Sequence, residues 1–451
     1  MNLYNTLTRR VEPLDCSDGI VNMYVCGITP YSSSHLGHAM CAVLFDVIRR
    51  YLEYKGFRVN HIQNFTDIDD KMIVAANETG VTVKDLAEEN IEAYLNELQI
   101  LNVLPATQYP KATEEIASIV KVIERLIEKQ YAYEVNGDVY FRVRNDRNYG
   151  KLSRRNLDEM LSGARLEVDE SKEYPGDFAL WKSEKPGEPS WDSPWGKGRP
   201  GWHIECTAMS LGYLENRVDI HGGGLDLVFP HHENEIAQSE AYTGTEPFSR
   251  FWVHNGTLGY GEEKMSKSLG NVFTIQAALD VFTPESLRLF FVSSHYRSPL
   301  IFADESVYSQ GRAIDRLKNA MNASSGMGEE IEHNSYKNAF EESMDDDLNT
   351  PKALGVIFDL AREINRKASK GGNVETAQAV LADLLSVLGI DISSKAKHSG
   401  ELEPYIDLLI RLRTDLRDAK QFAMADKIRD ELSVLGIKLE DNEGATRWLK
   451  E

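Results

Sequence analysis

The first seventy residues alternate between apolar and polar runs that predict a strand, a helix and a second strand. The apolar run "GIVNMYVCG" is typical of a short buried strand that stops at Gly27 and Pro30. Apolar residues then recur at helical spacing in "SSSHLGHAMCAVLFDVIRRYLEYKG", where a serine would cap the start and Gly56 would end the helix. "FRVNHIQNFTDID" supplies the next strand and loop. This order predicts an α/β domain with a parallel sheet whose ligand site lies at the strand ends.

The remaining pattern divides the chain into an inserted segment and a long helical region. We expect helices over 84–101 and 113–129, followed by a hairpin in "YAYEVNGDVYFRV" with Asn136 and Gly137 at its turn. Five prolines make 172–200 rich in loops, so about 110–200 is interpreted as an insertion in the α/β domain. Beyond residue 306 the pattern is almost wholly helical, with polar breaks at 324–335 and 391–404.

Length and composition narrow the class of protein. The 451 residues are enough for several cores and predict about three domains. No apolar run approaches the roughly 18 residues of a membrane span, and "MNLYNTLTRR" lacks the apolar centre of a signal peptide, so we expect a cytoplasmic protein. Four cysteines are too few for a disulfide framework and favour metal binding or catalysis. The net charge of -21 argues against indiscriminate nucleic-acid binding, although a local basic face could still bind a polyanion.

Residues that can bind a metal fall in three separated motifs. Cys26 follows the first strand, Cys206 lies in "GWHIECTAMS", and "DIHGGGLDLVFPHHENEIAQSEA" carries His231, His232 and Glu235. His231 and Glu235 are four residues apart on an expected helix, so they share one face. Thiolate, imidazole and carboxylate groups all bind zinc. From spacing alone, small core cysteines and a solvated His–Glu pair remain the alternative.

Two further motifs are suited to binding phosphate. In "EEKMSKSLGN", Lys264 and Lys267 form a cationic loop that can follow phosphate charge as it shifts during a reaction. In "HLGH", His35 and His38 place hydrogen-bond donors at a helix N-terminus, where the helix dipole favours an anion. Taken singly, the first could be a charged surface loop and the second a histidine pair at a helix cap. Their order along the chain makes the two together specific.

Together these motifs resemble the class I aminoacyl-tRNA synthetases, which activate amino acids as adenylates on a Rossmann-like core. Within that class the chain is similar to the cysteinyl-tRNA synthetase family almost from end to end, through "CG" before "HLGH", "FTDIDDK", "GWHIEC", "HGGG", "FPHHENEIAQSEA", "MSKSLGN", "DDLNTP" and "FAMADKIRDEL". The resemblance implies an α/β fold with a Rossmann-like parallel-sheet catalytic core, an inserted connective subdomain, a linker bearing KMSKS, a helical tRNA-binding bundle and a small C-terminal anticodon-contacting domain. The expected bounds are 1–110 with 200–245, 110–200, 246–305, 306–395 and 400–451.

The resemblance also implies one zinc ion per chain, held by Cys26, Cys206, His231 and Glu235, with the thiol of the substrate L-cysteine as a further ligand. A pocket of cysteine size separates cysteine from serine by shape only about 10²-fold. Direct sulfur ligation favours the thiol much more strongly, because a zinc site lowers the thiol pKa and prefers sulfur to a hydroxyl. An editing domain is then unnecessary, and no segment of the chain needs to be one.

Other site residues are implied by their place in the family motifs. Gly27, Thr66, Trp202 and Asp226 would bind the amino acid; otherwise Trp202 is a core residue, Thr66 a helix cap and Asp226 a turn residue. ATP with Mg²⁺ would be bound by His35, His38, His221, Gly222, Gly223, Gly224 and Lys267. His35, His38, Lys264 and Lys267 would stabilise the triphosphate while the substrate carboxylate attacks the α-phosphate.

Two departures from the family pattern bear on function. Leucine replaces isoleucine in "HLGH", which conserves volume. "CGITPY" has its proline two places later than many relatives, and this also resembles the mycothiol-pathway ligase that joins cysteine to a glucosaminyl-inositol. The C-terminal third, with "DDLNTPKALGVIFDLAREINRK", favours the tRNA enzyme. A non-catalytic tRNA-binding relative is the third alternative, disfavoured because all motifs and metal ligands are present.

The implied partners are tRNA(Cys), L-cysteine and ATP, with no membrane, and the protein is expected to be a monomer. From Glu401 onward the chain has 9 Lys and Arg against 12 Asp and Glu. Contact with tRNA would therefore need a local basic face, such as the one with Arg411, Arg413, Arg417 and Lys420.

Overall fold

The computed structural model describes residues 1–156, 171–215, 217–260, 263–264, 273–392, 399–442 and 445–450. The chain forms two compact units, Met1–Asp391 and Ile392–Glu451.

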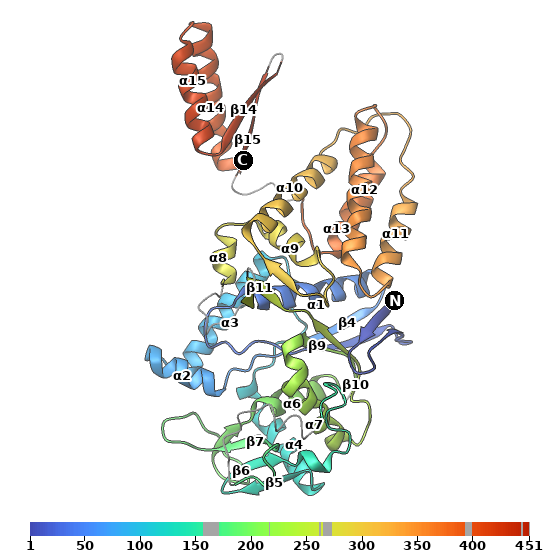
Figure 1. Ribbon diagram of the computed structural model, residues 1–451, viewed down its shortest axis with the longest axis vertical. Helices are drawn as coiled ribbons and strands as arrows, with labels where there is room; N and C mark the ends of the chain where they lie inside the picture. The colour runs from blue at the N-terminus through green and yellow to red at the C-terminus, as the bar shows by residue number, and fades with distance from the viewer. Residues whose placement is uncertain are drawn as a thin grey trace. The chain divides into compact units, whose positions relative to one another are not determined.

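A four-stranded parallel sheet forms the centre of the first unit (Figure 1). Its order is β10-β9-β3-β4, with bounds Ser249–Asn255, Val218–Gly224, Ile20–Val25 and Arg58–Gln63. Helix α1 (Leu36–Tyr54) connects β3 to β4, which confirms the predicted strand–helix–strand opening and the parallel sheet. Because β10 pairs with β9, the core sheet extends past the core boundary predicted at residue 245.

Helices α6 (Trp202–Tyr213) and α7 (Glu233–Thr243) pack on this sheet. Met209 of α6 and Ile236 of α7 share one buried apolar cluster with Tyr24 of β3 and Trp252 of β10. Burial of this surface is the main driving force that holds the helices on the strands. The same packing brings the N-terminal turns of both helices to the end of β3.

A hairpin and two helices accompany the core sheet. The N-terminal hairpin consists of β1 (Asn2–Asn5) and β2 (Arg10–Pro13). Helix α3 (Val83–Ile100) is the helix predicted over 84–101. Helix α2 (Asp70–Thr79) lies where the pattern predicts no helix, because it buries only Met72, Ile73 and Ala76 and so has a short apolar face.

The inserted segment contains a four-stranded antiparallel sheet (Figure 1). A 3₁₀ turn (Ala112–Glu114) and α4 (Ile116–Glu128) lead into the predicted hairpin, which turns at Asn136 and Gly137 with φ of 56° and 89°. Its strands are β5 (Ala132–Val135) and β6 (Asp138–Phe141), followed by a 3₁₀ turn (Val143–Asn145). The segment 172–200, predicted to be rich in loops, also contains two strands that were not predicted, β7 (Phe178–Ser183) and β8 (Gly198–Pro200), which complete the sheet. The prolines around and within them obscure these short strands in the sequence.

A small sheet and two helices follow β10. The sheet order is β12-β11-β13, with bounds Glu263–Lys264, Leu258–Tyr260 and Leu300–Phe302. The helices are α8 (Ile275–Leu279) and α9 (Pro284–Val292).

The helical region predicted beyond residue 306 is confirmed for the rest of the first unit. Its helices are α10 (Asp304–Met321), α11 (Asn334–Asp345), α12 (Thr350–Ala368) and α13 (Glu375–Val387), and the polar break at 324–335 separates the first two. Arg288 of α9 is buried where the bundle meets the core, and it bonds to Asp46 of α1 and to the carbonyl of Leu388. Arg288 thus ties α9 to α1, the helix that begins at "HLGH", and to the end of α13 through the carbonyl of Leu388.

The second unit is a helix pair with a hairpin. Helices α14 (Ser399–Asp418) and α15 (Phe422–Val434) precede the antiparallel strands β14 (Ile437–Asn442) and β15 (Ala445–Lys450). The prediction of an almost wholly helical end is therefore wrong for the last strands. The expected basic face also changes, because Arg413 is buried whereas Arg411, Arg417 and Lys420 are exposed.

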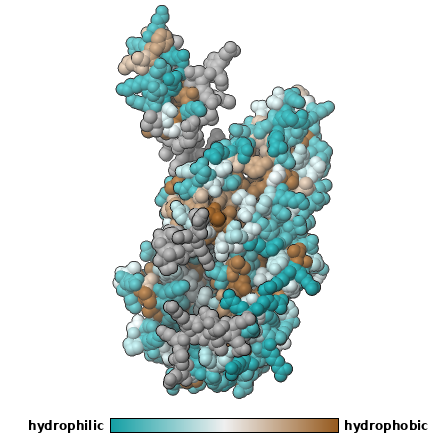
Figure 2. Space-filling model, in the orientation of Figure 1, coloured by the Kyte–Doolittle hydropathy of each residue, from teal (hydrophilic) through white to brown (hydrophobic). Residues whose placement is uncertain are grey.

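Hydrophilic side chains cover most of the face drawn in Figure 2, and hydrophobic residues form only separate spots on it. Among the described residues, no helix combines the length and apolar character needed to cross a membrane.

Candidate active site and metal centre

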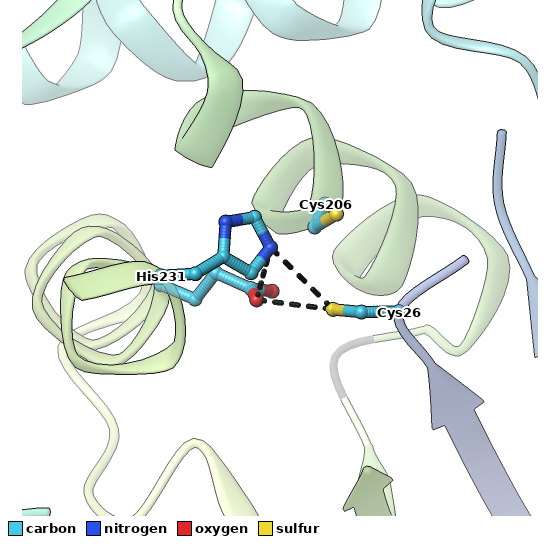
Figure 3. Close-up of side chains that lie close together, drawn as sticks. Cys26, Cys206 and His231 are labelled. Carbon is cyan, nitrogen blue, oxygen red and sulfur yellow. Dashed lines mark hydrogen bonds and ion pairs between the residues drawn. The ribbon is translucent and has the colours of Figure 1, made fainter. Parts of the chain in front are cut away.

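The four residues predicted as metal ligands meet at the end of β3. Cys26 follows that strand, Cys206 lies in α6, His231 lies just before α7, and Glu235 lies in its first turn. Figure 3 shows Cys26, Cys206 and His231 close together, with a dashed line between Cys26 and His231. All four side chains are buried. Side chains 209 positions apart in the sequence are thus in contact.

The spacing of the ligand atoms fits a tetrahedral metal ion. The Sγ of Cys26 lies 3.5 Å from Nε2 of His231 and 3.3 Å from Oε1 of Glu235, and these two atoms lie 3.1 Å apart. Zinc bonds of about 2.0–2.3 Å place tetrahedral ligand atoms roughly 3.3–3.8 Å from one another. All four ligand atoms, that of Cys206 included, lie within 4.8 Å of each other. The donor set and its spacing fit the zinc ion that the sequence implies.

The charges of the cluster also suit a cation. Burial raises the pKa of the Cys206 thiol, but the hydrogen bond from Cys26 and the nearby His231 outweigh it and bring that pKa to about 6. Burial lowers the pKa of His231, but Glu235 and Cys206 bring it to about 10. Despite burial, His221 and His231 hold the pKa of Glu235 well below its usual range. Buried negative groups are here paired with a positive charge, which is the role of a divalent ion in a metal site.

Two neighbours on α6 hold the ring of His231. Its Nδ1 lies 2.9 Å from Nδ1 of His203, so its Nε2 faces the cluster. Trp202 stacks on the same ring with centroids 4.5 Å apart and remains 38% exposed. A partner on the second ring nitrogen is typical of a metal-binding histidine. The open face of Trp202 can pack on a small substrate beside the cluster.

His221, predicted to bind ATP, lies in the metal cluster. It is fully buried in β9, with Nε2 at 3.6 Å from Sγ of Cys26 and 3.3 Å from Oε2 of Glu235. Its ring stacks on Trp252 with centroids 4.3 Å apart. Because the side chain faces inward, a contact of this residue with ATP would have to come from its backbone.

The glycines after His221 allow close packing. A Cβ on Gly222 would lie 2.2 Å from the ring of Phe45 in α1, and one on Gly223 would lie 2.8 Å from Leu227. On Gly224 it would lie 2.5 Å from Oδ1 of Asp226. The approach of β9 to α1 is therefore sufficient reason for Gly222, and an ATP contact by this segment stays a prediction.

An asparagine that the sequence analysis missed joins two of the predicted substrate residues. The backbone N–H of Gly27 donates to Oδ1 of Asn64 at 2.9 Å, and Nδ2 of Asn64 donates to Oγ1 of Thr66 at 3.4 Å. A Cβ on Gly27 would lie 1.6 Å from the carbonyl oxygen of Asn64, so only glycine fits. Asp226 is exposed on the 3₁₀ turn Leu225–Leu227. Gly27 and Thr66 thus belong to one largely buried network at the end of the sheet, whereas Asp226 lies at the surface.

The "HLGH" histidines cap α1. His35, rather than the predicted serine, is the N-cap residue, and its Nδ1 accepts from the N–H of Gly37 at 3.1 Å. The N–H of His35 donates to Nδ1 of His38 at 3.4 Å, and the two rings stack with centroids 3.7 Å apart. This reciprocal capping box fixes both partly exposed imidazoles at the positive end of a nineteen-residue helix.

Backbone hydrogen bonds tie "HLGH" to the segment after KMSKS. The N–H of Leu36 donates to the carbonyl of Phe273 at 3.1 Å, and the N–H of Ile275 donates to the carbonyl of Ser34 at 3.0 Å. On the other side of KMSKS, Lys264 pairs with Gly259 between β12 and β11. Lys267, like the side chain of Lys264, lies outside the described residues. The described segment that follows KMSKS therefore lies beside "HLGH".

Two residues around the site carry no role in the sequence analysis. His203 and Glu205 both lie in "GWHIEC", beside residues that were singled out. Glu205 is fully buried, and burial, together with Cys206 and Asp67, raises its pKa well above its ordinary value. Membership in a motif already quoted was the only signal that could have found them.

Comparisons with known proteins agree with this geometry. Residues 13–311 match the profile of the tRNA synthetases class I (C) catalytic domain, and residues 339–393 match the DALR domain. A cysteine–tRNA ligase from Dehalococcoides mccartyi is 53% identical over 455 residues, and one from Caldicellulosiruptor saccharolyticus is 47% identical over 466 residues; each alignment covers 99% of both chains. The solved methionyl-tRNA synthetase of Mycobacterium tuberculosis with methionyl-adenylate has a TM-score of 0.59 at 16% identity, covering 82% of this chain and 88% of that one.

The fold, the buried cluster and the catalytic-domain match define a class I tRNA synthetase, as the sequence predicts. Within that class the chain belongs to the cysteine–tRNA ligase family, whose members it matches over nearly their full length.

Proposed function

We propose that the protein joins L-cysteine to tRNA(Cys) in two steps, activation with ATP and transfer to the 3′ end of the tRNA. The observation that carries this proposal is the buried Cys26–Cys206–His231–Glu235 cluster in a chain of the cysteine–tRNA ligase family. The full-length matches favour this enzyme over the mycothiol-pathway ligase and over a non-catalytic relative. A cytoplasmic location and a monomeric state are part of the proposal.

Selection of cysteine is assigned to the metal cluster. Cys26, Cys206, His231 and Glu235 would hold zinc, which when bound supplies a soft acceptor that prefers a thiolate to a hydroxyl. Trp202 would pack on the amino acid beside His231. Asn64 would orient Gly27 and Thr66 at the wall of the pocket, and Asp226 would attract the ammonium group.

Activation is assigned to the charged groups at α1. The substrate carboxylate attacks the α-phosphorus of ATP, the bond to the bridging oxygen breaks, and pyrophosphate leaves. His35 and His38 at the helix terminus, with Lys264 and Lys267, would stabilise the charge that moves onto pyrophosphate, and Mg²⁺ would share it. A ribose hydroxyl at the tRNA 3′ end then attacks the cysteinyl carbonyl, and AMP leaves.

The acceptor is supported by the helical region. The DALR domain is a tRNA-binding module, and its match spans most of the bundle from α11 to α13. We assign contact with the anticodon to the second unit, through the exposed Arg411, Arg417 and Lys420.

A pair of assays tests this proposal. Pyrophosphate exchange should depend on cysteine, with serine at least about 10³-fold poorer because a metal-bound thiol has no hydroxyl equivalent. Transfer should charge purified tRNA(Cys) and leave a glucosaminyl-inositol acceptor unmodified when both are offered. Exchange without tRNA charging, or ligation to the glucosaminyl-inositol, would overturn the assignment.

A further inference from the structure

The predicted zinc ligands account for only part of the buried donor groups at the end of β3. A second set of four, Cys26, His221, His232 and Glu235, also brings its ligand atoms within 4.8 Å of one another. The two sets share Cys26 and Glu235. Cys206 and His231 complete one set, and His221 and His232 complete the other. All of these residues are buried.

The distances in the second set are those of a metal site. Nε2 of His221 lies 3.6 Å from Sγ of Cys26 and 3.3 Å from Oε2 of Glu235, close to the roughly 3.3–3.8 Å expected of tetrahedral zinc ligands. Nε2 of His232 lies 3.9 Å from the other carboxylate oxygen, Oε1. That separation is too long for a hydrogen bond but is close to the distance between two ligand atoms of one metal ion.

The ring of His232 is held as metal-binding rings are held. Nδ1 of His232 lies 2.7 Å from Nε2 of His254, whose Nδ1 in turn lies 2.8 Å from Oγ1 of Thr6. This chain directs Nε2 of His232 to the cluster in the way that His203 directs Nε2 of His231. Trp252 fixes the plane of His221 by stacking on it.

The second set also contains a buried ring nitrogen that makes no hydrogen bond to the described residues. Among the described residues, the buried Nε2 of His232 has no hydrogen-bond partner. A buried polar atom without a partner is energetically unfavourable. With neutral imidazoles, the charges of Cys26 thiolate and Glu235 sum to two negative units, so a divalent ion would form a neutral complex, which is the cheapest to bury. The first set has three anionic ligands and leaves one negative charge in excess.

We propose that Cys26, His221, His232 and Glu235 form a second metal position in the cluster, one that binds a divalent transition-metal ion without Cys206 or His231. With one sulfur and two nitrogen ligands it suits zinc and cobalt. An ion in this cluster then has two overlapping positions, of which only the first is rich in sulfur.

The test removes the first set and asks whether zinc stays. A Cys206→Ser, His231→Gln double variant should still bind zinc after dialysis, measured by metal analysis and by titration with a chromophoric chelator. Adding His232→Asn should then lower zinc affinity by about 10-fold or more, and His254→Ala by about 10–100-fold through the lost support of His232. In the same background, His203→Ala should change little. Cys16→Ser, a buried cysteine outside the cluster, is the control for thiol loss.

The outcomes separate this proposal from the proposed function. A wild-type protein without zinc would overturn both. A wild-type protein with zinc and a folded double variant without it, or with an affinity that His232→Asn leaves unchanged, would overturn the second position alone. If the double variant does not fold, Cys206→Ser alone carries the test with Co²⁺. Its thiolate-to-cobalt absorption should fall to about half, and His232→Asn should then weaken Co²⁺ binding by about 10-fold or more.

Discussion

The metal cluster and the "HLGH" segment both lie near the end of β3, but different groups hold them together. Side chains form the cluster, whereas backbone hydrogen bonds largely fix the "HLGH" segment. The cluster joins buried side chains from three separated motifs, and none of its predicted ligands is more than 7% exposed. At α1, the imidazoles are partly exposed and cap a helix, and backbone hydrogen bonds attach them to the segment after KMSKS. The proposed ligands account for this difference. We propose that the cluster selects a small thiol, for which soft donors fixed away from water are best, and that the "HLGH" segment binds a large anion, which needs donors that it can reach.

The strongest test of the metal cluster is Cys26→Ser, because Cys26 belongs to both sets of metal ligands. Zinc should be lost, cysteine activation should fall by about 10³-fold, and the preference for cysteine over serine should narrow. Metal analysis and pyrophosphate exchange with both amino acids measure this, with Cys16→Ser as control. An undiminished preference for cysteine in the folded variant would remove Cys26 from the site.

In the "HLGH" segment, a pair of substitutions at His35 separates its role as the N-cap of α1 from its proposed role in activation. Asparagine is a good N-cap, so His35→Asn should keep the unfolding free energy within a few tenths of a kcal/mol, whereas His35→Ala should lose about 1 kcal/mol. Both variants should slow activation by about 10²-fold because both lose the imidazole. Denaturant unfolding and pyrophosphate exchange give the two readings. Full activity in His35→Asn would mean that this histidine is only a cap.

The reason for glycine at position 222 of β9, close packing or contact with ATP, can be tested by substitution. Since a Cβ there meets Phe45, Gly222→Ala should cost about 1–3 kcal/mol of stability and leave the KM for ATP unchanged at temperatures where the variant is folded. Gly212→Ala is the matched control, because its Cβ meets no atom within 4 Å on helix α6, and it should stabilise slightly. A raised KM for ATP without a loss of stability would instead support the predicted ATP contact.

The smallest expected effect concerns the carboxyl group of Glu97, near the start of α8. Glu97 of α3 is buried and accepts from the N–H of Gln276 at the start of α8; burial raises its pKa to about 7. The folded state therefore binds a proton more tightly than the unfolded state. Stability from this group is present below about pH 4.5 and is lost as the pH rises to about 7.

Glu97→Gln should remove this pH-dependent loss of stability. The unfolding free energy of the variant minus that of wild type should be larger at pH 8 than at pH 5 by on the order of 1–2 kcal/mol, measured by denaturant unfolding at both pH values. Glu92→Gln, at an exposed position of the same helix, should behave as wild type. Equal pH dependence in all three proteins would show that Glu97 does not titrate in this range.

Prediction from sequence succeeded where local pattern and motif agree. The strand–helix–strand opening, α3, the Asn136–Gly137 hairpin and the helical bundle follow from apolar spacing and turn residues. The strands β7 and β8 and the final hairpin were missed because their pairing is set by partners distant in the chain. His221 shows the same limit within the site. Its motif indicates function, but the stacking on Trp252 and the distance to Cys26 depend on how β9 and β10 lie beside β3.

The pairing of "HLGH" with Phe273 and Ile275 has a further consequence for the length of the segment that carries KMSKS. The chain between Lys264 and Phe273 is eight residues long and is anchored at both ends by backbone pairing. The entropy of closing such a loop depends only weakly on its length, since each doubling adds about 0.6 kcal/mol. Lengthening this segment would therefore change the stability of the fold only slightly.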